Sequence, residues 1–141
     1  MKKFLFATLA ISLMFMSCNQ QAEVKETAAV TEPQTVETMV YYFHYSHRCA
    51  TCNAVEDVAK SSLSELYPEL VKEGKIGFQS LNLEEKDGEA LGEKLEVAGQ
   101  ELIIVKADKK TDLTELAFMY ARSNPEKLKE AIKGAIDELL K

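Results

Sequence analysis

Hydrophobic and polar positions change their period several times along the chain, and each change predicts a different element. Continuous apolar runs over residues 39–43 and 102–105 are typical of strands that are buried on both faces. Residues 76–83 alternate apolar and polar side chains with one irregular step, which predicts a third strand. Apolar residues recur at helical spacings over residues 50–67 and 89–97, so these two segments are predicted to be helices.

The last third of the chain predicts a hairpin followed by a terminal helix. A polar turn over residues 107–110 leads into a loosely alternating segment, 111–116, which is predicted to pair with the apolar strand before it. Residues 117–123 show no regular period. Asn124 and Pro125 then supply an N-cap and a first helical residue. The apolar residues of this final helix recur at steps of three and one: Leu128, Ala131, Ile132, Ala135, Ile136, Leu139 and Leu140.

The predicted elements follow the order β-α-β-α-β-β-α. A helical crossover makes the first two strands parallel, and the hairpin makes the last two antiparallel. The expected fold class is therefore α/β, with a central mixed four-stranded sheet flanked by helices. A chain of 141 residues with 46% hydrophobic content has room for one such domain. Its formal charge of −6 and scattered lysines argue against a nucleic-acid partner, because phosphate binding needs clustered basic side chains.

The N-terminal segment has the pattern of an export signal. Two lysines precede an apolar run over residues 4–16, which is shorter than the ~20 residues of a membrane-spanning helix. A signal peptide is therefore predicted over residues 1–17. Ser17 directly before Cys18 resembles the signal of bacterial lipoproteins, in which that cysteine receives lipid and becomes the mature N-terminus. In the other interpretation, Cys18 merely lies near the cleavage point.

An export signal places the protein in the cell envelope, and lipid on Cys18 would hold it on a membrane, facing the periplasm. Residues 18–38 are rich in Gln, Glu, Thr and Ala and show no sustained period, so we expect a flexible tether. The folded domain is expected over residues 39–141. Disulfides form and persist in exported proteins, and this bears on the two cysteines inside the domain.

Cys49 and Cys52 form a Cys-x-x-Cys pair between the first predicted strand and its helix. Two thiols at this spacing can close into a small disulfide ring, and a helix start favours the thiolate of the first one. We expect Cys49 to be the attacking thiol and Cys52, one helical turn later, to be the resolving thiol. His47 and Arg48 stand beside Cys49 and are expected to favour its thiolate.

Other interpretations of the same residues remain open. A purely structural disulfide is one, although so small a ring constrains the unfolded chain little. A metal-binding module is another, because His44, His47, Cys49 and Cys52 supply two imidazoles and two thiolates that suit zinc or copper. In a third, the domain is a non-catalytic interaction module that keeps its fold and has no chemistry.

The order of elements and the CATC motif together resemble the thioredoxin-like superfamily over residues 39–141. The segments YYFHYSHRCATC, AVEDVAK, KIGFQSLNLEE and ELIIVK resemble more narrowly the ArsF family. That family is described as a thioredoxin-like subunit of a nitrophenyl-compound nitroreductase, associated with an efflux permease for aromatic arsenicals. The resemblance implies a thioredoxin-like fold and marks Cys49 and Cys52 as the redox pair.

The chain departs from thioredoxins at a loop that faces the disulfide. Thioredoxins carry a cis-proline just before the third strand, where this chain has Gly99, Gln100 and Glu101. In that family the proline presents backbone to the substrate and keeps metals from the thiols. Its absence favours the metal alternative and weakens the interpretation as a general reductase.

The resemblance also implies a partner. The sequence carries neither a flavin nor a nicotinamide fingerprint, so we expect no cofactor beyond the Cys49–Cys52 pair. Each dithiol delivers one electron pair, which another protein must then replace. The expected partners are another redox protein or protein thiols and disulfides, with a second thioredoxin-like subunit or a permease as specific candidates. An electron-donating subunit for the reduction of aromatic nitro or arsenical compounds fits these requirements.

Overall fold

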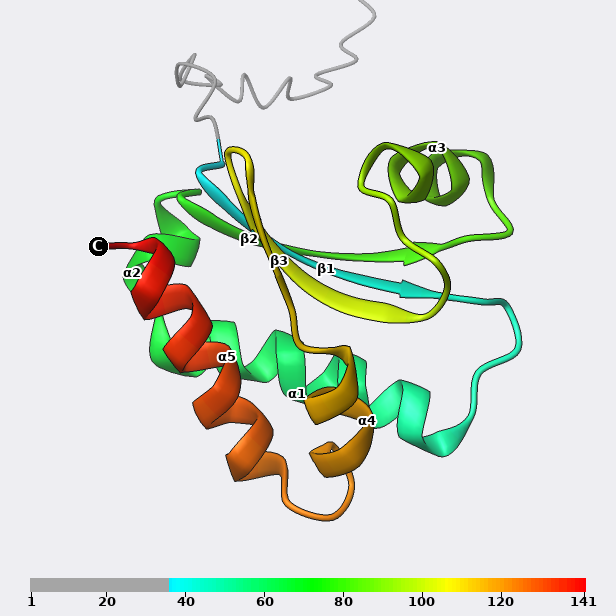
Figure 1. Cartoon of the computed structure of the whole chain (residues 1–141). Coiled ribbons are helices and arrows are strands. Elements are labelled where there is room, and N and C mark those ends of the chain that lie inside the picture. The colour runs from blue at the N-terminus through cyan, green and yellow to red at the C-terminus, as the bar shows by residue number, and fades with distance from the viewer. Residues whose placement is uncertain (1–35) are drawn as a thin grey trace, which may run out of the picture. The chain divides into compact units, whose positions relative to one another are not determined.

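The computed structural model of the chain describes residues 36–141, which form an α/β domain with one mixed four-stranded sheet flanked by helices (Figure 1). The sequence pattern predicted this class. The predicted signal peptide, Cys18 and nearly all of the predicted tether lie outside the described residues. Within residues 36–141, none of the helices combines the length and the hydrophobicity needed to cross a bilayer. In chain order the elements are β1 (Thr38–His44), α1 (Ala50–Leu66), α2 (Pro68–Lys72), β2 (Ile76–Asn82), α3 (Lys86–Lys94), β3 (Glu101–Lys106), β4 (Lys109–Asp112), α4 (Thr114–Tyr120) and α5 (Pro125–Leu139).

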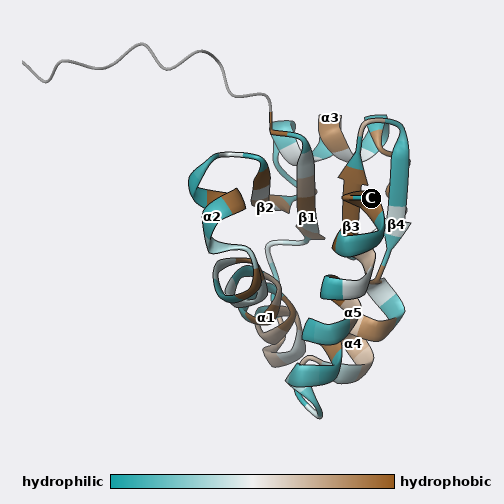
Figure 2. Ribbon diagram, turned by 90° about the vertical axis from the view of Figure 1, so that its left-hand side faces the viewer, coloured by the Kyte–Doolittle hydropathy of each residue, from teal (hydrophilic) through white to brown (hydrophobic). Residues whose placement is uncertain are grey.

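The sheet has the strand order β2-β1-β3-β4. Strand β1 pairs in parallel with β2 and antiparallel with β3, and β3 pairs antiparallel with β4. The predicted strand directions are therefore confirmed. Figure 2 shows β3 coloured as hydrophobic and β4 as hydrophilic, in keeping with the place of β4 at the edge of the sheet. Its two lysines, Lys109 and Lys110, discourage pairing of this edge with another chain.

Strand β1 is buried on both faces because helices cover both sides of the sheet (Figure 1). Val40 and Tyr42 point to the side of α1, α4 and α5, whereas Phe43 points to the side of α3, and all three side chains are fully buried. Alternation along the strand thus divides one apolar run between two cores. The larger core is built from Val40, Tyr42, Val55, Ala59, Leu63, Ile76, Leu102, Ile104, Leu113, Ala117, Ala121, Leu128, Ile132 and Ile136.

The predicted hairpin is confirmed, but the bounds predicted for its second strand, residues 111–116, are wrong. Strand β4 ends at Asp112, and residues 114–120, partly assigned to an irregular stretch, form the helix α4. The apolar residues that pack inward are Leu113, Ala117 and Ala121, which recur every four positions, as on one face of a helix. The Asp112 carboxylate also accepts a hydrogen bond from the backbone N–H of Thr114 (2.8 Å), which ends the strand and starts the helix.

Helix α3 begins at Lys86, three residues before its predicted start, because Asp87-Gly88 lies inside the helix and is not a turn. Gly88 is buried against the end of β2, and a Cβ atom added to it would lie 2.0 Å from the carbonyl oxygen of Asn82. Glycine therefore allows α3 to approach the backbone of β2 closely. The predicted helices that became α1 and α5 are confirmed, and the Asn124 side chain caps α5 as expected.

Replacement of Gly88 by alanine should destabilise the domain by about 1–3 kcal/mol, since the new methyl group meets immovable backbone. Gly134→Ala is the matched control, because a Cβ added there in α5 would meet no heavy atom within 4 Å apart from its own stretch of helix. This variant should gain about 0.5–1 kcal/mol from the higher helix propensity of alanine. Urea unfolding followed by circular dichroism measures both values. Equal midpoints for the two variants would contradict the close approach of α3.

Candidate functional site

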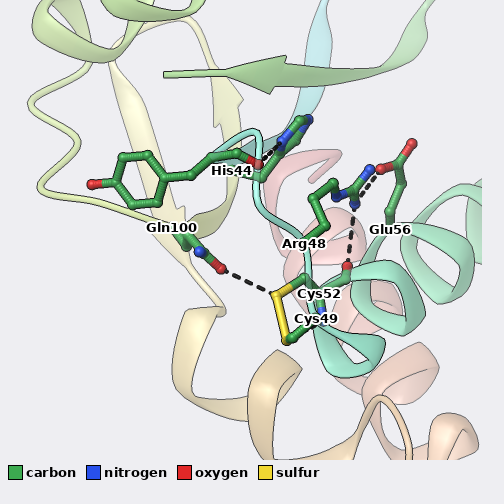
Figure 3. Close-up of a disulfide and its surroundings, with 7 residues drawn as sticks. His44, Arg48, Cys49, Cys52, Glu56 and Gln100 are labelled. Atoms are coloured by element: carbon green, nitrogen blue, oxygen red, sulfur yellow. Dashed lines mark hydrogen bonds and ion pairs between the residues drawn. A yellow bond between two sulfur atoms is a disulfide. The ribbon is translucent and has the colours of Figure 1, made fainter. Parts of the chain in front are cut away.

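The candidate site lies where β1 ends and α1 begins, and it contains a disulfide between Cys49 and Cys52 (Figure 3). The Cα atoms of the two residues are 5.1 Å apart. Strand β1 runs through the middle of the sheet and ends at His44, and a short loop carries the chain to Cys49. An inner strand of the sheet therefore fixes the position of the pair.

Cys49 is the N-cap of α1, with φ −85° and ψ 168°. Its sulfur accepts a hydrogen bond from the backbone N–H of Cys52 at 3.2 Å, and its carbonyl oxygen accepts one from Asn53 at 3.1 Å. The first turn of α1 carries no acidic side chain. A Cys49 thiolate would therefore receive both an N–H donor and the positive end of the helix dipole, and both stabilise negative charge on sulfur.

The two cysteines differ in burial. Cys49 is exposed, whereas Cys52 lies one turn into the helix and is 3% exposed. A partner can reach the sulfur of Cys49 but not that of Cys52 without movement of the chain. This difference in burial allows Cys49 to attack a partner disulfide first and Cys52 to form the Cys49–Cys52 bond afterwards.

Arg48 makes its contacts beneath the pair and not with the Cys49 sulfur. Its guanidinium forms an ion pair with Glu56 (2.5 Å) and donates a hydrogen bond to the carbonyl oxygen of Cys52 (3.3 Å). Figure 3 shows the guanidinium turned toward Glu56, away from the sulfur atoms. Because Glu56 neutralises its charge, Arg48 ties the loop to α1 more than it supports a thiolate. The contacts of Arg48 therefore do not include the Cys49 sulfur, whose thiolate the sequence analysis expected it to favour.

Glu56 connects this cluster to the sheet, and the sequence analysis did not identify it. Its carboxylate accepts a hydrogen bond from the hydroxyl of Ser80 on β2 (3.0 Å). Arg48 also lies 5.6 Å from the centre of the Tyr42 ring, and burial raises the pKa of Tyr42. The spacing of four between Cys52 and Glu56, which places both on one helix face, is the signal that could have indicated this residue.

The loop before Cys49 is held from the opposite side by the loop after β2. The backbone N–H of Ser46 donates to the carboxylate of Glu84 (2.8 Å), and the Asn82 side-chain amide donates to the Ser46 hydroxyl (2.9 Å). Hydrogen bonds from the side chain and backbone of Ser46 lower the pKa of Glu84. Both ends of the loop are thus fixed, so the cysteine at the helix start is held in place.

The four residues of the metal alternative are not brought together. The Nδ1–H of His44 donates to the carbonyl oxygen of Tyr45 (3.0 Å), His47 is exposed, and both sulfur atoms are in the disulfide. Over residues 36–141 there is no group of three or more His, Cys, Asp or Glu side chains that could hold a metal ion.

Gln100 contacts the pair from the loop between α3 and β3, the segment over residues 99–101 that the sequence analysis expected to face the disulfide. Its Oε1 atom lies 3.4 Å from the sulfur of Cys52, at hydrogen-bonding distance for a thiol (Figure 3). A Cβ added to the neighbouring Gly99 would lie 3.7 Å from the Tyr45 hydroxyl, an ordinary van der Waals contact, so the space there does not require glycine. Glu101 turns away, and its carboxylate accepts from the backbone N–H of Ala98 (2.8 Å).

In the reduced protein, Cys49 should react with iodoacetamide at least about tenfold faster than Cys52, because only Cys49 combines exposure with a stabilised thiolate. Fragmentation mass spectrometry of the peptide that contains both residues measures the two rates in a Cys18→Ser background. The denatured chain is the control, in which the two cysteines should react alike. Faster alkylation of Cys52 in the folded chain would contradict this geometry.

Comparisons with known proteins assign no family. No family model matches the chain, and no curated protein matches it. Among solved structures the chain is similar to one described as a malarial protein, with 19% identity over 58% of this chain and 92% of that chain. The TM-score of 0.38 is too low for this similarity to identify the fold or a function.

Proposed function

We propose that the chain is a thiol–disulfide exchange protein that acts through Cys49 and Cys52. The observation that carries the proposal is the contrast between the two sulfur atoms. Cys49 is an exposed residue whose sulfur accepts a backbone N–H at the start of α1, and Cys52 is buried one turn further on. A purely structural disulfide requires no such contrast, whereas exchange requires an accessible nucleophile and a protected resolving thiol.

In the proposed exchange, the Cys49 thiolate attacks a partner disulfide, forms a mixed disulfide and releases the other partner sulfur as a thiolate. Cys52 then loses its proton and attacks the Cys49 sulfur. The bond between Cys49 and the partner breaks, the Cys49–Cys52 bond forms, and the departing partner sulfur takes up the proton. The pair gives up two electrons, and the partner disulfide gains them. The reverse sequence oxidises a partner dithiol.

The proposal includes a thioredoxin-like fold. The order of the strands in the sheet, the parallel pair β1–β2, the antiparallel strands β3 and β4, and a Cys-x-x-Cys pair between β1 and α1 all support it. Helices α2 and α4 are additions to the order expected from the sequence.

We further propose, from the resemblance to the ArsF family, that the protein donates electrons for the reduction of aromatic nitro or arsenical compounds. Another redox protein, such as a second thioredoxin-like subunit, would resupply the pair, and a permease is a candidate neighbour. Cells that lack this chain and still reduce such compounds at the normal rate would contradict this role.

The proposed location is the cell envelope, on a membrane that the protein reaches through lipid on Cys18. The apolar run and Ser17-Cys18 support this location. Labelling of the wild-type chain with radioactive palmitate tests the anchor. Absence of the label from Cys18 would contradict it.

Replacement of Cys52 by serine should trap a mixed disulfide between Cys49 and a partner, because no thiol remains to release it. Incubation of the reduced variant with a peptide disulfide, followed by mass spectrometry of the intact chain, measures the adduct. Cys49→Ser is the matched control and should form little adduct, since the remaining Cys52 is 3% exposed. Both variants carry Cys18→Ser. Trapping by the Cys49→Ser variant alone would reverse the assigned roles.

A further inference from the structure

We propose that Gln100 is the polar partner of Cys52 during the redox cycle and determines when the resolving thiol becomes reactive. This inference rests on the proposed exchange function and deepens it. Gln100 comes from the loop before β3, 48 residues along the chain, yet its amide oxygen lies 3.4 Å from the Cys52 sulfur. Among the residues that the structure describes, no other polar group lies at hydrogen-bonding distance from this sulfur, which gains a proton to donate when the disulfide is reduced.

The contact with Gln100 indicates which cysteine of the reduced pair keeps its proton. A carbonyl oxygen accepts a hydrogen bond and repels a negative charge, so Gln100 stabilises Cys52 as a protonated thiol. The Cys49 sulfur has the opposite partner, the backbone N–H of Cys52, which stabilises a thiolate. The shared proton of the dithiol therefore belongs to Cys52, the buried member of the pair, where a charge would be costly.

A glutamine amide suits this position because it carries a donor and an acceptor on one side chain. The oxygen accepts from the Cys52 thiol in the resting dithiol. When Cys52 loses its proton to attack the mixed disulfide, a half-turn of the amide presents an N–H to the new thiolate. A carboxylate at the same position accepts but does not donate, so it would hold Cys52 protonated.

The charged groups around Cys52 are bound to other partners and do not contact its sulfur. Arg48 forms an ion pair with Glu56 and donates a hydrogen bond to the Cys52 carbonyl oxygen, so neither charge is paired with the Cys52 sulfur. Glu101, next to Gln100, is bound to the backbone N–H of Ala98. On the other packed elements, Tyr42 of β1 lies with Arg48, His44 is bound to the Tyr45 carbonyl, and Glu115 of α4 is exposed.

The test compares Gln100→Glu with the wild-type chain, both in a Cys18→Ser background and both fully reduced. Dipyridyl disulfide, which is uncharged, is the probe. Its first thiol release reports attack by Cys49, and its second reports ring closure by Cys52. Gln79→Glu on β2 is the matched control, because it makes the same charge change at an exposed position outside the site.

Gln100→Glu should slow the second release at neutral pH by about tenfold, as expected for a shift of one unit in its pH midpoint toward alkaline values. The first release should change by less than about twofold, as in the Gln79→Glu control. Circular dichroism confirms that both variants are folded. Equal slowing of the two releases, slowing of the first alone, or no change in either would overturn the assignment of Gln100. Failure of the wild-type chain to show any first release would instead overturn the proposed exchange function.

Discussion

The hydrogen bond from the Cys52 N–H to the Cys49 sulfur is the interaction on which the proposed chemistry depends. It makes a cysteine the N-cap of α1, a place that serine, threonine, aspartate or asparagine usually fills. The cap gives the sulfur a donor and the positive end of a helix, so the same contact that starts the helix also prepares a nucleophile. The geometry of this hydrogen bond is fixed because β1 is buried on both faces and ends directly before the loop that leads to Cys49.

Contacts from three directions then give the two sulfur atoms different properties. From below, Arg48 and Glu56 tie the start of α1 to β2 through Ser80. From the side, Glu84 holds the backbone of the loop. From the loop before β3, Gln100 contacts the sulfur of the buried Cys52, while Cys49 is exposed. The resulting site is asymmetric, and that asymmetry is what thiol exchange needs, since one thiol must attack and the other must wait.

The features that could be predicted from the sequence are those encoded locally. Strand β1, helices α1 and α5 and the Cys-x-x-Cys pair follow from periodicity and spacing within a few residues. Residues 111–116 were assigned incorrectly because Leu113 and Leu116 can be placed on a strand or a helix, and packing of Ala117 and Ala121 decides for the helix. The contacts around the two cysteines could not be predicted from the neighbouring sequence. Gln100 approaches from 48 residues away, and the ion pair with Glu56 determines where Arg48 points.

The central claim is that Cys49 and Cys52 form a reversible redox pair and not a permanent structural link. Equilibration of the intact chain with graded ratios of oxidised and reduced glutathione, read by mass spectrometry after acid quenching, tests it most directly. The account predicts a single reversible two-electron transition in the folded protein, at a potential between about −270 and −120 mV, the range of known exchange proteins. A disulfide that stays closed until the chain unfolds, with a potential below about −300 mV, would contradict it.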